Sequence, residues 1–319
     1  MSSDHRGAPA SAELAIQTED LGKSFESTRA VDSLDLSVTR GQFFGLLGPN
    51  GSGKTTTIQM LATLVRPTDG RAFVAGYDVG REPVAVRRNI GLVFQDSTLD
   101  RTLTVAENLR FAGMLQGLSG AQIRERTDEL LELFSLSEKR DAKLPTLSGG
   151  MRRALDIARG VLHRPDILFL DEPTLGLDVP SRRNLWRYIE RVRRERNMTV
   201  FLTTHYLEEA EGCDRVVFLA GGRTVGSGAP TSLIDALGSY ILEVEAEDPC
   251  RTMGAMTERF GPGLESGDKM IFRVQDASFD GTGLQADLDG RVRSVSWRRP
   301  TLNEVFLWTI GPGLDIGNP

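Results

Sequence analysis

The chain has 319 residues, which is longer than one ordinary domain and predicts two. Its composition, 39% hydrophobic and 26% charged, excludes a disordered chain, and no run approaches the roughly 20 apolar residues of a membrane-spanning helix. With 38 basic against 44 acidic residues and no long basic run, it is a poor candidate for binding nucleic acid.

The first residues, MSSDHRGAPASAE, carry charge and proline where a signal peptide would carry an apolar core. We therefore expect the chain to stay on the side of the membrane where it is made, with residues 1–12 disordered. Cys213 and Cys250 form no spaced pair, so neither a disulfide nor a zinc site is predicted.

From residue 13 to 237, patterns typical of strands and helices alternate, which predicts an α/β domain with a mostly parallel sheet covered on both faces. Helical periodicity over 104–136 interrupts this order and predicts an all-helical insertion, set at about 97–160. The other predicted elements are short strands within 14–47, a helix over 53–64, strands in RAFVAG and NIGLVF, a helix over 148–163, a strand in ILFL, a helix over 181–195, strands in TVFLTT and RVVFLA, and between these two a short helix in YLEEAEG.

Residues 238–319 differ in character and predict a small α+β domain. SYILEVEAE, KMIFRVQ and GRVRSVSW are typical of strands, whereas DPCRTMGAMTERFG and TLNEVFLWTI are typical of helices. Counted over 236–319, 13 acidic and 8 basic residues give −5 of the chain's net charge of −6. The predicted appendage is therefore acidic, and the rest of the chain is almost neutral.

Residues 48–55, GPNGSGKT, match the phosphate-loop pattern G-x-x-x-x-G-K-[ST]. They follow the apolar strand FFGLL and open a helix, which is the setting that the motif needs. Its glycines let successive N–H groups point inward, and the helix N-terminus adds positive charge. We expect Lys54 to reach the β and γ phosphates and the Thr55 hydroxyl to bind Mg²⁺. The alternative is an ordinary glycine turn before a helix.

Two carboxylates, Asp171 and Glu172, end the apolar strand ILFL. Because the carboxyl ends of parallel strands lie at one edge of a sheet, both are expected beside the phosphate loop. Asp171 is then the natural Mg²⁺ partner through a water, and Glu172 can polarise a water that attacks the γ phosphate. The alternative is a turn of acidic residues before Pro173.

A second helix start that could receive an anion follows Leu147. Ser148 is a good N-cap, and Gly149 and Gly150 leave the first amides of the helix uncovered. Taken alone, this sequence is equally well explained as a helix cap.

Six motifs stand in a fixed order: the phosphate loop, Gln95 after GLVF, LSGGM over 147–151, LFLDEP over 168–173, Gly-Leu-Asp178 and Thr-Thr-His205. In this order they resemble the nucleotide-binding subunit of ABC transporters over about residues 14–235. LSGG separates that family from other P-loop ATPases. Met151, the following RRALDIARG and the C-terminal PTLNEVFL resemble the daunorubicin/doxorubicin-resistance type of bacterial exporter ATPase within it.

The resemblance implies a P-loop NTPase cassette, with a mostly parallel core, an antiparallel β part and the helical insertion. It implies that Glu172, His205 and Gln95 are catalytic, that Thr55, Gln95 and Asp171 bind Mg²⁺, and that Asp178 communicates across a dimer. Phe25 stands where the family usually stacks a tyrosine on adenine. The ATP-binding residues implied are Phe25, Gly48, Pro49, Asn50, Gly51, Ser52, Gly53, Lys54, Thr55, Thr56, Ser148, Gly149, Gly150 and Asp178.

The resemblance also implies partners and a location. Two cassettes pair head to tail with LSGGM of one closing on the ATP of the other, and a separate integral membrane permease docks near Gln95 and the insertion. The protein would then be peripheral, on the cytoplasmic face of the membrane, and would export a small molecule, lipid or glycan that its sequence does not identify.

Two other functional hypotheses stay open. One is a soluble ABC ATPase that acts on nucleic acid or ribosomes, although such proteins usually carry two fused cassettes or basic surfaces. The other is a degenerate cassette that binds without catalysis, although every catalytic position is filled. For 238–319, a stabilising or dimer-contact domain stands beside a regulatory or assembly element in which TLNEVFLW is a docking helix.

Overall fold

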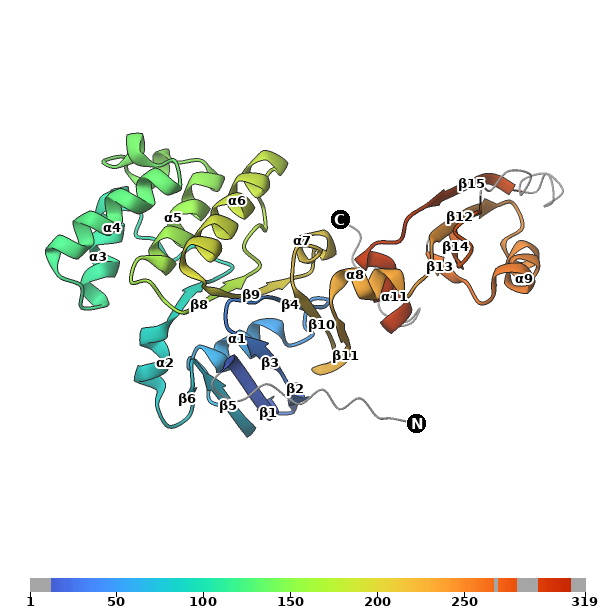
Figure 1. Ribbon diagram of the computed structural model, residues 1–319, viewed down its shortest axis with the longest axis horizontal. Helices are drawn as coiled ribbons and strands as arrows, with labels where there is room; N and C mark the ends of the chain where they lie inside the picture. Colours follow the sequence, from blue (N-terminus) through green and yellow to red (C-terminus); the bar gives the residue numbers. More distant parts are fainter. Residues whose placement is uncertain (1–12, 267–268, 280–291, 311–319) are drawn as a thin grey trace. The chain divides into compact units, whose positions relative to one another are not determined.

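The computed structural model describes residues 13–266, 269–279 and 292–310 (Figure 1). Residues 1–12, which we expected to be disordered, lie outside this range. The chain divides into two compact units. Unit 1 holds the described residues up to His205 together with 219–224, and unit 2 holds 206–218 and the described residues from 225 onward. In the described part of the chain, no helix combines the length and apolarity needed to cross a membrane.

An antiparallel sheet of five strands opens unit 1. Its order is β2-β1-β5-β6, and β3 also pairs with β1, so the long strand β1 organises the sheet. The strands are β1 (Leu14–Phe25), β2 (Thr28–Leu34), β3 (Ser37–Thr39), β5 (Asp69–Val74) and β6 (Tyr77–Asp78). Because β1 ends at Phe25, this sheet sets the position of the aromatic side chain that we expected to meet adenine.

The second sheet carries the phosphate loop and the acidic strand end. Strands β4, β9, β8 and β7 are parallel neighbours in that order, and the sheet continues past β4 through β10 and β11, whose residues are divided between the two units. All residues of β4, β8 and β9 are buried, as in sheets covered on both faces. The strands are β4 (Phe43–Leu47), β7 (Ile90–Val93), β8 (Ile167–Asp171), β9 (Thr199–Thr204), β10 (Arg215–Ala220) and β11 (Arg223–Gly228).

The helices of unit 1 begin and end at local signals in the sequence. Capping boxes at Thr104/Glu107 and Ser119/Gln122 start α3 and α4, and Asn197 ends α6 in a left-handed conformation. Helices α3 and α4 lie together, away from the antiparallel sheet (Figure 1). The helices are α1 (Lys54–Leu61), α2 (Pro83–Asn89), α3 (Val105–Leu115), α4 (Gly120–Leu133), η2 (Ser137–Lys139), η3 (Leu144–Thr146), α5 (Gly149–Val161) and α6 (Val179–Arg196).

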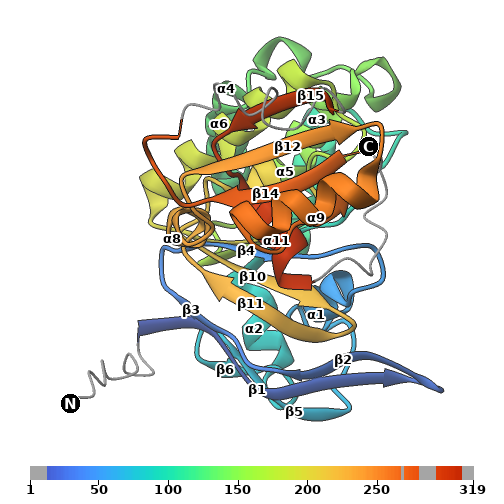
Figure 2. The same cartoon turned by 90° about the vertical axis from the view of Figure 1, so that its right-hand side faces the viewer.

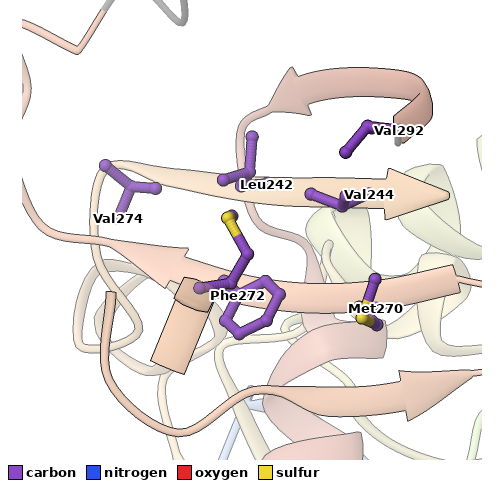
Figure 3. Close-up of a cluster of buried hydrophobic side chains, with 7 residues drawn as sticks. Leu242, Val244, Met270, Phe272, Val274 and Val292 are labelled. Atoms are coloured by element: carbon purple, nitrogen blue, oxygen red, sulfur yellow. The ribbon is translucent and has the colours of Figure 1, made fainter. Parts of the chain in front are cut away.

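Unit 2 contains an antiparallel sheet of order β13-β14-β12-β15 with α9 packed along β14 and β12 (Figure 2). Alternate residues of β12 and β14, among them Leu242, Val244 and Phe272, point to one face and form its core with Met256 (Figure 3). The elements are α7 (Leu207–Ala210), α8 (Pro230–Asp235), β12 (Tyr240–Ala246), α9 (Pro249–Phe260), β13 (Leu264–Ser266), β14 (Lys269–Val274), β15 (Val292–Arg298) and α11 (Leu302–Ile310).

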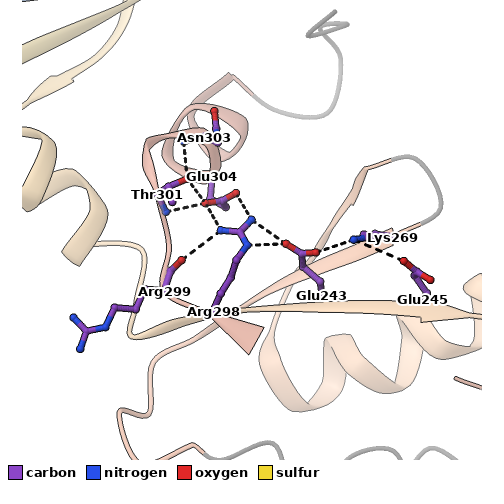
Figure 4. A network of polar contacts seen from close by, with 8 residues as sticks. All are labelled: Glu243, Glu245, Lys269, Arg298, Arg299, Thr301, Asn303 and Glu304. Carbon is purple, nitrogen blue, oxygen red and sulfur yellow. Dashed lines mark hydrogen bonds and ion pairs between the residues drawn. The ribbon is translucent and has the colours of Figure 1, made fainter. Parts of the chain in front are cut away.

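A polar network joins β12 and β15 to the start of α11 (Figure 4). The Arg298 guanidinium donates to both Glu304 oxygens, at 3.2 and 2.8 Å, and to Glu243 at 2.9 Å. Glu304 also accepts from the Thr301 main-chain N–H at 2.8 Å, which caps the helix. Phe306 on the same helix packs against Phe218, with ring centroids 5.4 Å apart. The C-terminal helix is therefore held by both charge and apolar contact within unit 2.

Candidate active site

The phosphate loop has a conformation that only glycine adopts without strain. Gly51 has φ of 79° and Gly53 has φ of 105°, both in the left-handed region. A Cβ at Gly53 would lie 2.4 Å from the Ala30 carbonyl oxygen, so that position is also sterically closed. At Gly51 a Cβ would meet nothing within 4 Å, which leaves open space beside the loop.

The first turn of α1 is prepared for an anion. Its N-cap is Gly53, no side chain caps it, and its first turn has no acidic residue. The first amides of a helix lack partners within the helix and carry partial positive charge. A cavity of about 560 Å³ lies here. Its lining is Phe25, Ala30, Asn50, Gly51, Gly53, Lys54, Thr55, Thr56, Gln95, Glu172, Leu175 and His205.

Lys54 supplies a buried positive charge at this cavity. Its side chain is 4% exposed, and Nζ donates to the carbonyls of Gly48 at 2.8 Å and Pro49 at 3.0 Å. Burial lowers the pKa of Lys54, and the nearby Glu172 carboxylate, 3.6 Å from Nζ, opposes that shift. A phosphate oxygen is charged and would therefore be a stronger acceptor for Nζ than these carbonyls. Lys54 thus fits the ligand predicted for it.

Asp171 ends β8 beside the first turn of α1. Its Oδ1 accepts from the hydroxyls of Thr203 at 2.6 Å and Thr55 at 3.2 Å. Burial raises the pKa of this carboxyl, and the two hydroxyl hydrogen bonds counteract the shift. Asp171 and Thr55 thus bring two hard oxygen donors together, which suits Mg²⁺ completed by phosphate and water. Within the described ranges no three His, Cys, Asp or Glu side chains group as metal ligands.

Glu172 lies between two nitrogen groups. One carboxylate oxygen is 3.6 Å from Lys54 Nζ and the other is 3.1 Å from His205 Nδ1. Its φ of 45° is in the left-handed region, which is strained for a side chain of this kind. The main-chain N–H of Glu172 donates to the Thr203 carbonyl at 3.0 Å, which helps to hold the turn. A carboxylate fixed in this way can accept a proton from a water at the cavity wall.

Phe25 and Gln95 line the same cavity from other segments. Phe25 is 44% exposed, and Lys23 Nζ lies 4.9 Å from the centroid of its ring. The ring is therefore accessible to a flat partner such as a purine base. Gln95 follows β7, next to the strand that ends in Asp171.

Seven of the predicted ATP-binding residues are absent from the cavity lining: Gly48, Pro49, Ser52, Ser148, Gly149, Gly150 and Asp178. Ser148 caps α5, accepting from the Met151 N–H at 3.2 Å, and Asp178 is the N-cap residue of α6. The cavity of one chain therefore brings together the phosphate loop, Gln95, Glu172, Phe25 and His205, and it leaves the LSGGM motif outside.

Several residues of the site were not foreseen from the sequence. Ala30 and Leu175 line the cavity, Thr203 holds Asp171 and Glu172, and Arg153 contacts the main chain behind them. A weak signal for Thr203 was present, because two threonines end the otherwise apolar strand VFL. Nothing in the sequence pointed to Arg153, since its partners lie 18 to 59 residues away along the chain.

Known proteins are similar to this chain in sequence and in fold. The ABC transporter family model matches residues 31–175. The chain is 42% identical to the daunorubicin/doxorubicin resistance ATP-binding protein DrrA of Streptomyces peucetius, over 94% of each chain. It is 38% identical to the Nod factor export ATP-binding protein I of Cupriavidus metallidurans, over 93% of this chain and 97% of that one.

Solved structures agree. An ATP-binding subunit of an ABC transporter superposes with a TM-score of 0.63 at 30% identity, covering 70% of this chain and 92% of that one. A dimeric ATP-binding cassette in a post-hydrolysis state, bound to ADP and Pi, gives a TM-score of 0.61 at 27% identity over 67% of this chain and 97% of that one. The chain therefore belongs to the ABC transporter family, as an ATP-binding subunit that hydrolyses ATP.

Proposed function

We propose that this chain is the motor of an exporter, which couples hydrolysis of Mg-ATP to movement of a small molecule, lipid or glycan through a separate permease chain. The hydrolytic role is supported by the position of Glu172, whose carboxylate lies between Lys54 and His205 at the wall of the cavity. The exporter part is supported by relatives named for drug resistance and for Nod factor export. The protein would then work at the cytoplasmic face of the membrane.

The residues divide the chemistry between them. The amides of the phosphate loop and Lys54 bind the β and γ phosphates, and Phe25 supports the adenine. Thr55, Asp171 and Gln95 would hold Mg²⁺, which supplies charge neutralisation at the phosphates when bound. Glu172 orients the attacking water and accepts its proton, and His205 keeps the carboxylate in place and contacts the γ phosphate.

A second copy of the chain would complete the site. The N-terminus of α5, at Ser148, Gly149 and Gly150, has amides suited to phosphate but lies outside its own cavity. In a head-to-tail dimer it would close on the ATP of the partner, and Asp178 would lie in the loop that connects the two sites. A related cassette is dimeric, which supports the pairing of two copies.

The permease would dock on the helical insertion. At the end of α3, Phe111, Met114 and Leu115 are 54, 57 and 72% exposed. Their spacing of three and four residues places them on one helix face, where they form an apolar patch. An apolar surface of this kind on the helical insertion suits a membrane partner whose movement must reach the ATP site.

The region assigned to the cassette spans 13–237, and residues 238–319 form a regulatory or assembly domain in this proposal. The helix expected to dock on the permease is α11, yet its residues Leu302, Val305 and Phe306 are buried within unit 2. This burial supports a stabilising role for α11 in preference to a role as a docking helix.

Substitution of Glu172 tests the hydrolytic role. Glu172→Gln keeps the shape of the side chain but cannot accept a proton, so we expect turnover of Mg-ATP to fall by about 10²-fold or more while ATP binding persists. The matched control is Glu132→Gln, an exposed carboxylate on α4 that should leave turnover unchanged. ATPase rates and nucleotide affinity, measured on purified protein with and without the permease, decide the result. Full turnover in Glu172→Gln would reject the proposed role.

A measurement of ATP turnover in the presence of each partner separates transport from the alternative role on nucleic acid or ribosomes. The proposal expects the permease in membranes to stimulate ATP turnover and RNA to have no effect. Stimulation by RNA or ribosomes alone would favour the alternative.

A further inference from the structure

Arg153 is a buried cation that the mechanism above does not use. It lies in α5, two residues after the LSGGM motif, and is 7% exposed. Its guanidinium donates only to main-chain carbonyls in the contacts that the structure gives: Phe94, Gln95, Asp171, Glu172 and Pro173. Asp156, Asp171 and Asp96 attract this guanidinium through their charge. Its hydrogen bonds nevertheless go to the main chain, where an arginine in the interior would normally bind a carboxylate directly.

The five acceptors belong to the two segments that carry the catalytic side chains. Toward the Gln95 segment, Nη1 lies 2.5 Å from the Phe94 oxygen and 3.3 Å from the Gln95 oxygen. Toward the Glu172 turn, Nη2 lies 3.2 Å from the oxygens of both Asp171 and Glu172, and Nε lies 2.5 Å from that of Pro173. The planar, five-donor guanidinium can bridge both segments at once, which a lysine cannot do.

The same helix holds the Gln95 segment further along. Arg159, six residues after Arg153, donates to the Thr98 carbonyl at 3.1 Å and lies 3.6 Å from Asp156. Asp156 in turn accepts from Ser97 and from the Thr98 N–H. Residues 94–98 are thus attached to α5 through a row of polar side chains spaced three residues apart, which is one face of the helix.

We propose that Arg153 is a positioning residue that fixes Glu172 and Gln95 relative to each other and to the LSGGM helix. The inference rests on the catalytic roles proposed above for those two residues. Arg153 supports the strained turn at Glu172 from behind, since it binds the carbonyls on both sides of it. Any shift of α5 when its N-terminus meets a nucleotide then moves the water-orienting carboxylate and the Gln95 segment together.

Replacement of Arg153 should therefore reduce the chemical step and spare binding. For Arg153→Met we expect kcat for ATP to fall about 10²-fold, the effect of a small misplacement of catalytic groups, with KM and nucleotide Kd changed less than about threefold. The matched control is Arg126→Met, which also removes an arginine that donates to a main-chain carbonyl, at Leu162. Among the described residues, no hydrogen bond or ion pair joins Arg126 to the site. Its kcat should equal that of the natural protein. A normal kcat in Arg153→Met would overturn the inference.

Arg153→Lys keeps the charge and guards against loss of folding in the methionine variant. Lysine reaches one segment only, so a folded Arg153→Lys protein, with an unchanged Tm, should still lose most of the kcat. Full activity in Arg153→Lys would show that buried charge, and not the bridge, is what matters, and would overturn the inference.

The Glu172→Gln background distinguishes this inference from the proposed function. If Arg153 acts through Glu172, adding Arg153→Met to Glu172→Gln should reduce the residual turnover by less than about threefold, because the two losses are not additive. A further 10²-fold loss would show independent action and overturn the inference. Full turnover in Glu172→Gln alone would instead reject the proposed role of Glu172.

Discussion

The buried carboxylate of Asp171 lowers the stability of the fold at a position where the site needs an oxygen ligand. Burial raises its pKa, so the ionised carboxylate destabilises the fold at neutral pH. This penalty is absent when the pH is below 3.8, the ordinary pKa of an aspartate. It grows as the pH rises through the raised pKa that Asp171 has in the folded protein. A bound cation would offset this cost.

We expect Asp171→Asn to raise the Tm by a few degrees at pH 7 in the absence of nucleotide, because the amide retains an oxygen acceptor without the charge. The gain should shrink toward acid pH, where the natural side chain is protonated in the folded protein. Hydrolysis of Mg-ATP should be lost. Calorimetry from pH 4 to 8 gives the comparison, with the exposed Asp141→Asn as the control; an unchanged or lower Tm at pH 7 would contradict the explanation.

Some residues of the site could be predicted from the sequence, whereas others reach the site only through the tertiary structure. The phosphate loop could be predicted because the glycines and Lys54 act through local backbone geometry. His205 and Gln95 follow strands and could be placed by the order of motifs. Arg153 could not, because its hydrogen bonds reach carbonyls at and just after the ends of β7 and β8 and depend on how α5 lies against the sheet.

The N-terminus of α5 shows how an element uses two adjacent glycines differently. A Cβ at Gly150 would lie 2.5 Å from Ser181 Oγ and 2.9 Å from its Cβ, so this glycine allows α5 to approach the start of α6. A Cβ at Gly149 would meet only Leu177, at 3.9 Å. Gly149 has no packing reason to be glycine within one chain, which is consistent with a partner's phosphate approaching its backbone.

Gly149→Ala should therefore keep or slightly raise the Tm, because alanine favours helix, yet weaken ATP-dependent dimerisation. Gly150→Ala should lower the Tm through the clash with Ser181. Both can be tested in the Glu172→Gln background, by thermal unfolding and by size-exclusion chromatography with ATP. Gly254→Ala, at an open position on α9, is the matched control and should dimerise normally. Normal dimerisation of Gly149→Ala would remove the support for a functional glycine.

Long elements were predicted more easily than short ones. The buried strands and the amphipathic helices have periodic patterns over many residues, which explains why the alternation of strand and helix was visible. By contrast β6 has two residues, β13 has three and α8 has six, too few for a period to be recognised. β2 is separated from β1 by a tight turn after Phe25, so its pattern merged with that of its neighbour.

One buried carboxylate in each unit responds to acid in the opposite direction from the other: Glu304 in unit 2 and Asp171 in unit 1. Burial alone would raise the pKa of Glu304, but the Arg298 guanidinium, together with the N–H and hydroxyl of Thr301, outweighs it and lowers the pKa. A lowered folded-state pKa stabilises the fold above the ordinary value of 4.5, and this contribution is lost as the pH falls through the folded-state value. In unit 1, acid instead relieves the penalty at Asp171.

From these two carboxylates we expect acid to open the sheet beside Glu304 before the strand that ends in Asp171. Hydrogen exchange followed by mass spectrometry should show that amides of β12 lose protection at a higher pH than those of β8. Glu304→Gln should lower the local stability of unit 2 by about 1.5–3 kcal/mol at pH 7, since it removes charge-assisted hydrogen bonds to Arg298. It should also weaken the dependence on pH, because the side chain no longer titrates.

The exposed Glu265→Gln on β13 serves as the control in the same unit and should leave exchange unchanged. Two outcomes would contradict this explanation: β8 opening before β12 in acid, or Glu304→Gln keeping the full pH dependence. In either case the polar network at α11 would not determine the stability of unit 2 in acid. The acidic charge of the C-terminal region would then act through its overall repulsion and not through this one buried carboxylate. The comparison of the two variants separates these causes, because each removes one carboxylate from unit 2 but only Glu304 is buried against an arginine.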